Sequence, residues 1–154
     1  MNVTRFATVT LLLAATSAVP LAAQAADGLV AVKSPHPPAE TAARLEAALK
    51  QRNLTLFARI DHAAGAARIG QTLRPTELFI FGNPQGGTPL MACQQSAGID
   101  LPLKALIWED SNGQTWFGYN NPAWLAARHG ATDCPVVPNL TKALEGIAAA
   151  STAP

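Results

Sequence analysis

Two short polar motifs contain residues that could bind another molecule or react with it. Asp61-His62 follows an alternating segment, and Asn83-Pro84 follows a short apolar one. Loops at the ends of strands commonly carry function because a rigid scaffold positions them. A histidine beside a carboxylate can act as a base or a ligand, or it can be solvated without a role. We therefore take Asp61, His62 and Asn83 as the candidate ligand-binding residues.

The remaining motifs do not specify a cofactor. The glycines of Gly86-Gly87-Thr88 suit an anion held on backbone N–H groups, but the segment lacks the lysine of a nucleotide-binding loop. No two of the histidines His36, His62 and His129 have the i,i+4 spacing of a helical metal site. No G-x-S-x-G motif indicates a serine hydrolase. We therefore predict no metal, no organic cofactor and no catalytic residue.

The two cysteines, Cys93 and Cys134, are predicted to form a disulfide. In an exported chain two cysteines pair more often than they remain as buried thiols, which is the alternative. Neither belongs to a C-x-x-C motif, so a zinc site is not indicated. The pair closes a loop of 134 − 93 = 41 residues, and the chain-entropy estimate for such a loop is about 4 kcal/mol.

Residues 1–25 have the pattern of a secretory signal peptide. Arg5 supplies the positive charge, an apolar run extends from Phe6 to Ala23, and Ala23-Gln24-Ala25 gives the small-x-small cleavage pattern. We expect cleavage after Ala25, a periplasmic location and no membrane attachment of the mature chain. A retained membrane anchor is the alternative, and the run is short for a span of roughly 20 residues.

Length and charge limit the classes of function. The chain has 154 residues and a net charge of +1, and loss of Arg5 with the signal peptide leaves 10 basic and 10 acidic residues. A neutral chain lacks the positive surface that nucleic-acid binding requires. We expect a single domain over residues 26–154 that ends in a helix.

The apolar patterning alternates between strand and helix periods. Segment 54–61 alternates cleanly, so Leu54, Leu56, Ala58 and Ile60 are expected on one face. Asn112-Gly113 predicts a hairpin turn. The predicted strands are 29–32, 54–61, 77–81, 103–109 and 114–120, and the predicted helices are 39–52, 63–73, 90–97, 122–129 and 140–150.

Two helices are expected to begin with a capping residue followed by proline. Thr88 with Pro89, and Asn121 with Pro122, each fit the preference for a polar cap and a proline in the first turn. The order of strands and helices predicts the α+β class, with a mostly antiparallel sheet of about five strands and helices packed on one face.

Five stretches, in the same order along the chain, resemble the family of the domain of unknown function DUF302. They include the segment around Asp61-His62, the Asn83-Pro84 pair and the Asn-Asn-Pro of 120–122; the stretches are 57–66, 74–84, 87–91, 98–109 and 119–125. The resemblance implies a β-α-β(4)-α fold and a homodimer. It implies no known activity and no catalytic role for His62.

The predicted function is therefore general. We expect an exported α+β domain that binds a small molecule or a partner near Asp61, His62 and Asn83 and that works as a homodimer rather than as an enzyme. One alternative is a metal-dependent or redox accessory protein, or an enzyme, that uses His62. Another is a purely structural homodimer without a pocket.

Overall fold

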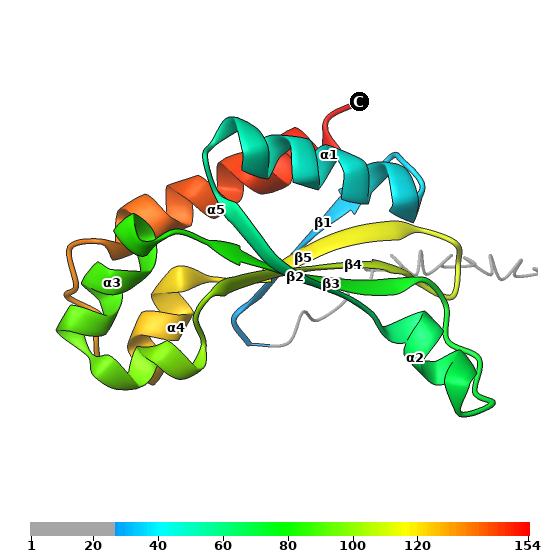
Figure 1. Cartoon of the computed structure of the whole chain (residues 1–154). Helices are drawn as coiled ribbons and strands as arrows, with labels where there is room; N and C mark the ends of the chain where they lie inside the picture. The colour runs from blue at the N-terminus through cyan, green and yellow to red at the C-terminus, as the bar shows by residue number, and fades with distance from the viewer. Residues whose placement is uncertain (1–26) are drawn as a thin grey trace, which may run out of the picture.

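A computed structural model of the protein describes residues 27–154, so the predicted signal peptide and its cleavage site lie outside the described residues. Figure 1 shows one antiparallel sheet with two long helices along one of its faces. The strands are β1 (Leu29–Ser34), β2 (Thr55–Asp61), β3 (Thr76–Gly82), β4 (Leu103–Glu109) and β5 (Thr115–Asn120). The α-helices are α1 (Pro38–Gln51), α2 (His62–Arg68), α3 (Pro84–Cys93), α4 (Pro122–Arg128) and α5 (Val137–Thr152), and a short 3₁₀ helix, η1, spans Gln95–Ile99.

The sheet has the strand order β1-β5-β4-β3-β2, and every neighbouring pair is antiparallel. Helices α1 and α5 pack side by side and cover the same face (Figure 1). The predicted α+β class is thus confirmed, and the long elements follow the β-α-β(4)-α order. The predicted hairpin is also present: Trp108 pairs with Trp116 across it, and their rings stack with centroids 6.2 Å apart.

The core lies between the sheet and the two long helices. Alternate residues of the central strands point toward the helices because side chains alternate across a pleated strand. Full burial of one such side chain contributes about 1.5–3 kcal/mol. The core includes Phe79, Phe81, Ala105, Ile107, Phe117 and Tyr119 from the sheet, and Leu45, Leu49, Leu144 and Ile147 from α1 and α5.

Strand β2 departs from the clean alternation that its sequence predicts. Its pairing with β3 shifts between Leu56 and Ala58, which leaves Phe57 as the extra residue of a β-bulge. Leu56 packs against the core, whereas Ile60 is exposed. The prediction that Leu56, Ala58 and Ile60 share one face was therefore wrong, because a bulge reverses the alternation and sequence periodicity does not reveal it.

Helix α3 begins earlier than predicted. The side chain of Asn83 caps the helix by accepting from the backbone N–H of Gly86 at 2.8 Å, and Pro84 occupies the first turn. Thr88 and Pro89 are thus inside the helix and do not begin it. Asn83-Pro84 has the same cap-and-proline pattern, and Gly86 and Gly87, which precede the predicted helix 90–97, lie in the first turns of α3.

Helix α2 is shorter than predicted. It ends at Arg68 instead of residue 73, and it buries none of its own side chains. Ile69 and Leu73, which the predicted helix 63–73 included, are 76% and 47% exposed. The small side chains of this helix give little area to bury, so it projects from the end of β2 (Figure 1).

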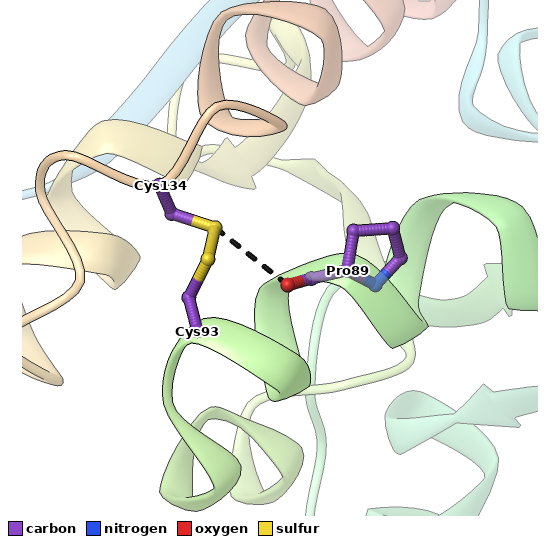
Figure 2. The surroundings of a disulfide bond; sticks show 3 residues. All are labelled: Pro89, Cys93 and Cys134. Atoms are coloured by element: carbon purple, nitrogen blue, oxygen red, sulfur yellow. Dashed lines mark hydrogen bonds between the residues drawn. A yellow bond between two sulfur atoms is a disulfide. The ribbon is translucent and has the colours of Figure 1, made fainter.

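The predicted disulfide between Cys93 and Cys134 is present, with the Cα atoms 6.0 Å apart. It joins the last residue of α3 to the irregular segment before α5 (Figure 2). The Sγ atom of Cys134 also lies 3.6 Å from the carbonyl oxygen of Pro89, within α3. Two elements that are distant in sequence are therefore fastened together at one end of the sheet.

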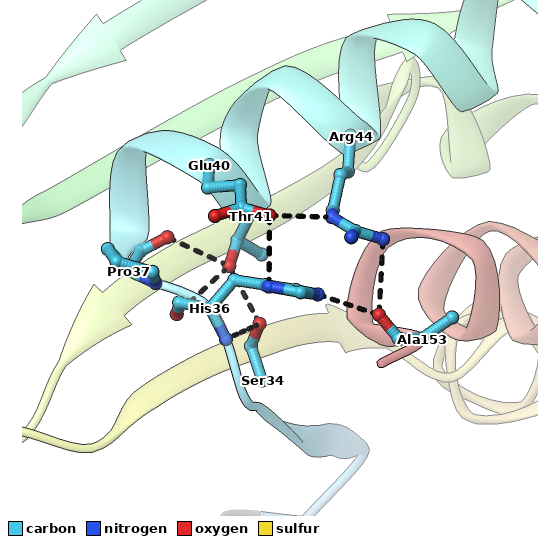
Figure 3. A network of polar contacts seen from close by, with 7 residues as sticks. All are labelled: Ser34, His36, Pro37, Glu40, Thr41, Arg44 and Ala153. Atoms are coloured by element: carbon cyan, nitrogen blue, oxygen red, sulfur yellow. Dashed lines mark hydrogen bonds and ion pairs between the residues drawn. The ribbon is translucent and has the colours of Figure 1, made fainter.

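A polar network holds the other end of α5 (Figure 3). The imidazole of His36 contacts the carbonyl oxygen of Ala153 at 2.7 Å and the carboxylate of Glu40 at 3.0 Å. The guanidinium of Arg44 donates to the same carbonyl oxygen at 3.1 Å and to Glu40 at 3.2 Å. The C-terminal end of α5 is thus tied to the beginning of α1.

Candidate functional site

The three sequence-predicted site residues do not come together. Asp61 and His62 lie at the end of β2 that pairs with Glu77, whereas Asn83 follows the other end of β3, where Thr55 pairs with Gly82. Six residues of an antiparallel strand span about 20 Å. The structure therefore separates Asp61 and His62 from Asn83, and a role of each in binding stays a prediction.

Asp61 has a local structural contact, and His62 is open to solvent. The carboxylate of Asp61 caps α2 by accepting from the backbone N–H of Ala64 at 2.8 Å. His62 is the exposed first residue of α2. Within residues 27–154, no group of three or more His, Cys, Asp or Glu side chains is close enough to hold a metal ion.

Asn83 lines an apolar pocket of about 710 Å³. The walls are α3 and the segment after it on one side, α5 on another, and the beginning of β2 with the end of β3. Phe57, the bulge residue, is 56% exposed and lies at the rim. The apolar lining residues are Leu54, Phe57, Phe81, Pro84, Met91, Leu101, Pro102, Leu103, Val136, Leu140, Ala143, Leu144 and Ile147.

Helix α5 serves the core and the pocket together. The pocket-lining residues of α5 and the residue before it follow the i, i+3, i+4 spacing of one helical face; they are Val136, Asn139, Leu140, Ala143, Leu144 and Ile147. Leu140, Leu144 and Ile147 form its apolar face, and all three lie in the predicted helix 140–150. That stripe was the sequence signal for the pocket wall, but its pattern is the same as that of a helix that only covers a sheet.

The loop before β4 is fixed by Lys104. Its Nζ donates to the carbonyl oxygens of Asp100 at 2.9 Å and Pro102 at 3.0 Å. Burial lowers the pKa of Lys104, and the nearby charge of Asp100 opposes that shift. These bonds hold Leu101 and Pro102 as one side of the pocket, a contribution that sequence reasoning missed because it depends on contacts across a loop.

A second polar cluster lies outside the pocket lining. Ser96 Oγ lies 3.0 Å from His129 Nδ1, and His129 Nε2 lies 2.7 Å from Asp100 Oδ2. This order of hydroxyl, imidazole and carboxylate resembles an activated nucleophile. However, Ser96 is exposed on η1, and none of these three residues lines the pocket. The cluster joins His129, at the end of α4, to Ser96 of η1 and to Asp100 just after it.

Comparison with known proteins places this fold in a family. The profile of the family described as "Domain of unknown function DUF302" matches residues 30–147. The chain belongs to the DUF302 family. The crystal structure of an uncharacterized conserved DUF302 protein from Bacillus stearothermophilus is similar, with a TM-score of 0.75 at 21% identity, over 82% of this chain and 99% of that one. At this identity the likeness shows the fold alone.

Curated relatives match this chain at higher identity. A protein of Brucella suis named "Fluoride-specific ion channel FluC 1" is 51% identical over 110 residues, which is 71% of this chain and 43% of that protein. The Brucella abortus protein of the same name is also 51% identical over 110 residues, 41% of its length. This chain thus spans about two fifths of these relatives. In the part of it that the structure describes, no helix is long and apolar enough to cross a membrane.

Proposed function

We propose that this DUF302 domain binds a small, largely apolar ligand in the pocket between α3 and α5. The pocket itself carries the proposal, because its volume of about 710 Å³ is within the range of about 300–1,000 Å³ of ligand sites. Most of its lining is apolar, and the few polar side chains, among them Asn83 and Asn139, supply orientation. Phe81 and Leu144, both fully buried, form its inner surface.

Rigid elements support the pocket on its sides. The disulfide fastens α3 near the start of α5, and Arg52 at the end of α1 donates to the carbonyl oxygen of Gly146 in α5 at 3.0 Å. A pocket that exists before binding costs less ordering entropy when the ligand enters. The arrangement supports binding rather than catalysis, since the Ser96 cluster lies outside the pocket lining.

Filling the pocket tests the proposal. Ala143 is an exposed lining residue of α5, so Ala143→Phe adds bulk to the pocket without removing a core contact. Ala149→Phe is the matched control, because Ala149 is an exposed alanine of the same helix outside the lining. With the neutral dye N-phenylnaphthylamine as probe, fluorescence titration should show binding to the wild type and the control and lost binding in Ala143→Phe. Equal binding by all three proteins contradicts the proposal.

We also propose that the domain forms a homodimer through the sheet face opposite α1 and α5. An apolar row crosses all five strands in register on that face: Ala31, Gly118, Leu106, Leu78 and Ile60. Helix α2 projects beyond the edge of the same sheet (Figure 1), and Ile69, the residue that follows it, is 76% exposed. In a two-fold contact each copy presents the same patch to the other, so both apolar surfaces can be covered at once.

A substitution that introduces a charge on that sheet face tests the dimer. Leu106→Arg should shift the wild-type dimer to a monomer in sedimentation velocity, because the half-buried Leu106 is central in the row. Lys142→Glu, on an exposed position of α5, controls for a change of charge elsewhere. A monomeric wild type at micromolar concentration contradicts the dimer.

We also propose that the protein is exported to the periplasm. The N-terminal pattern motivates it, and the disulfide suits an oxidising compartment. N-terminal sequencing of protein from a periplasmic extract should begin at Ala26. A membrane-bound form that keeps Met1 contradicts it.

The curated relatives support a second candidate function: that this domain works together with a fluoride channel. The observation that favours it is the 51% identity to proteins named "Fluoride-specific ion channel". Deletion of the gene should then sensitise cells to fluoride and not to chloride, and a plasmid with this chain should restore growth. Unchanged growth in fluoride contradicts this candidate and leaves the ligand pocket unaffected.

A further inference from the structure

The charges around the pocket are uneven. Among the described residues that line it, Arg52 is the one that carries a full charge, and no carboxylate is included. The other polar lining side chains are neutral amides and a hydroxyl, such as Asn83, Asn139 and Thr88. A cationic ligand would have no carboxylate in the lining to pair with, whereas an anionic ligand would have the guanidinium of Arg52.

Arg52 is held beside the pocket with donors to spare. Its Nη1 donates to the carbonyl oxygen of Ala48 at 3.1 Å, and its Nη2 donates to that of Gly146 at 3.0 Å. A guanidinium has five N–H donors. Within the described chain, no carboxylate lies within ion-pair distance of Arg52. The remaining donors and the whole positive charge are thus available to a ligand.

The beginning of α3 does not compete for an anion. The sequence suggested that the glycines there present free backbone N–H groups. In the structure, the N–H groups of Gly86 and Gly87 donate to the side-chain and backbone oxygens of Asn83. These two backbone N–H groups are therefore already paired within the helix cap. Arg52 is the charged group that the pocket lining offers to an anion.

The pocket is long, and Arg52 stands near one end of it. Along α5 the lining extends from Val136 to Ile147, which at about 1.5 Å per residue is roughly 16 Å. Arg52 contacts Gly146, beside Ile147, whereas Met91 and Val136 lie at the end near the disulfide. The site thus combines a cationic head position with an extended apolar channel.

We infer that the ligand is an anionic amphiphile, of the class of medium-chain monocarboxylic acids, with its carboxylate on Arg52 and its apolar chain along α5. This inference rests on the proposed ligand-binding function and names the chemical class for the same pocket. Paired N–H donors of a guanidinium match a carboxylate in geometry as well as in charge. The neutral amides of the lining do not oppose this orientation.

The test compares three probes that share a chain and differ in the head group: decanoate, decanol and decylamine. Isothermal titration calorimetry on the full mature protein, below the concentrations at which the probes aggregate, gives each affinity. Decanoate should bind about three- to tenfold more tightly than decanol, since the ion pair lies at an exposed rim, and decylamine should bind most weakly. The advantage of decanoate should shrink as salt is added.

Substitutions assign the preference to Arg52. Arg52→Gln should bring decanoate and decanol to similar affinity, and Arg52→Lys should keep part of the preference because it keeps the charge. Arg44→Gln is the matched control: Arg44, within α1, likewise donates to a carbonyl oxygen at the end of α5, that of Ala153, but it does not line the pocket. Circular dichroism and urea unfolding verify that each variant is folded.

The outcomes separate the two proposals. Equal affinity of the wild type for decanoate and decanol, or a decanoate preference that persists in Arg52→Gln, overturns the inference about the head group while the apolar pocket stands. Failure of all three probes to bind overturns both. A preference lost in Arg52→Gln and kept in Arg44→Gln supports the carboxylate site.

Discussion

Opening the Cys93–Cys134 disulfide should loosen one wall of the pocket before it loosens the sheet. The bond joins α3 to the segment that leads into α5. The sheet has a separate core with α1 and the later part of α5, around Phe79 and Leu45. A smaller cluster, which includes Leu90 and Cys134, packs on the Cys134 side of the bond. Reduction acts directly on this second cluster.

The size of the effect follows from the loop that the bond closes. The two cysteines are 41 residues apart, and the chain-entropy model gives about 4 kcal/mol for that length. We take this as an upper value, because the segment keeps other contacts: the N–H of Cys134 donates to Ala131 and that of Val137 donates to Cys134. We therefore expect the free energy of unfolding to fall by about 2–4 kcal/mol.

Urea unfolding followed by tryptophan fluorescence, with and without a dithiol reductant, measures that difference. Hydrogen exchange under native conditions should show faster exchange first at residues 90–100 and 131–137 and little change in β3–β5. The double variant Cys93→Ala/Cys134→Ala should resemble the reduced wild type and be insensitive to reductant. Unchanged stability on reduction, or exchange that rises first in the central strands, would falsify this reasoning.

Three further predictions concern the body of the domain. Leu45→Ala, at a fully buried position of α1, should cost about 2–5 kcal/mol in urea unfolding, and a loss below 1 kcal/mol would contradict the core described above. Gly28→Ala should cost about 1–3 kcal/mol, because Gly28 has φ +84° and the Trp124 ring occupies the position of a new Cβ; an unchanged urea midpoint refutes this. The indole N–H of Trp116 and the backbone N–H groups of Gln114 and Asn112 lower the pKa of Asp110 from its ordinary 3.8, so its stabilising effect is present above that pH and is lost as pH falls through the lowered pKa. Asp110→Asn should thus be less stable than the wild type at neutral pH and equal to it in strong acid, and a difference that persists in acid argues against the mechanism.

Most of the fold was predictable because strong local signals agreed with the tertiary structure. The strand 103–109 was predicted with the bounds that β4 has, and the Asn-Gly turn placed β5 beside it. Asn121 with Pro122 correctly marked the start of α4. In each case one local interaction, a turn or a cap, decides the boundary, and the sequence contains all of it.

The errors arose where two local patterns competed or where a distant contact decided. Asn83-Pro84 and Thr88-Pro89 both resemble helix starts, and the cap that Asn83 forms with Gly86 was the better one. For α2, apolar spacing predicted a longer helix, but Ile69 and Leu73 remain 76% and 47% exposed, so their burial does little to stabilise it. The bulge at Phe57 depends on pairing with β3, which no local pattern contains.

The pocket was the feature least accessible to sequence reasoning, because it depends on how far apart two walls are held. Helix α5 has an apolar face broad enough to cover the sheet with Leu144 and Ile147 and to extend past its edge with Leu140. There the disulfide ties the end of α3 to the segment before α5, and Lys104 fixes the loop that forms another wall of the pocket. The sequence-based search favoured polar residues at strand ends, and of these only Asn83 reaches the site. The arginine that supplies its charge, Arg52, was read only as the end of a helix, since its contact with Gly146 joins residues 94 positions apart.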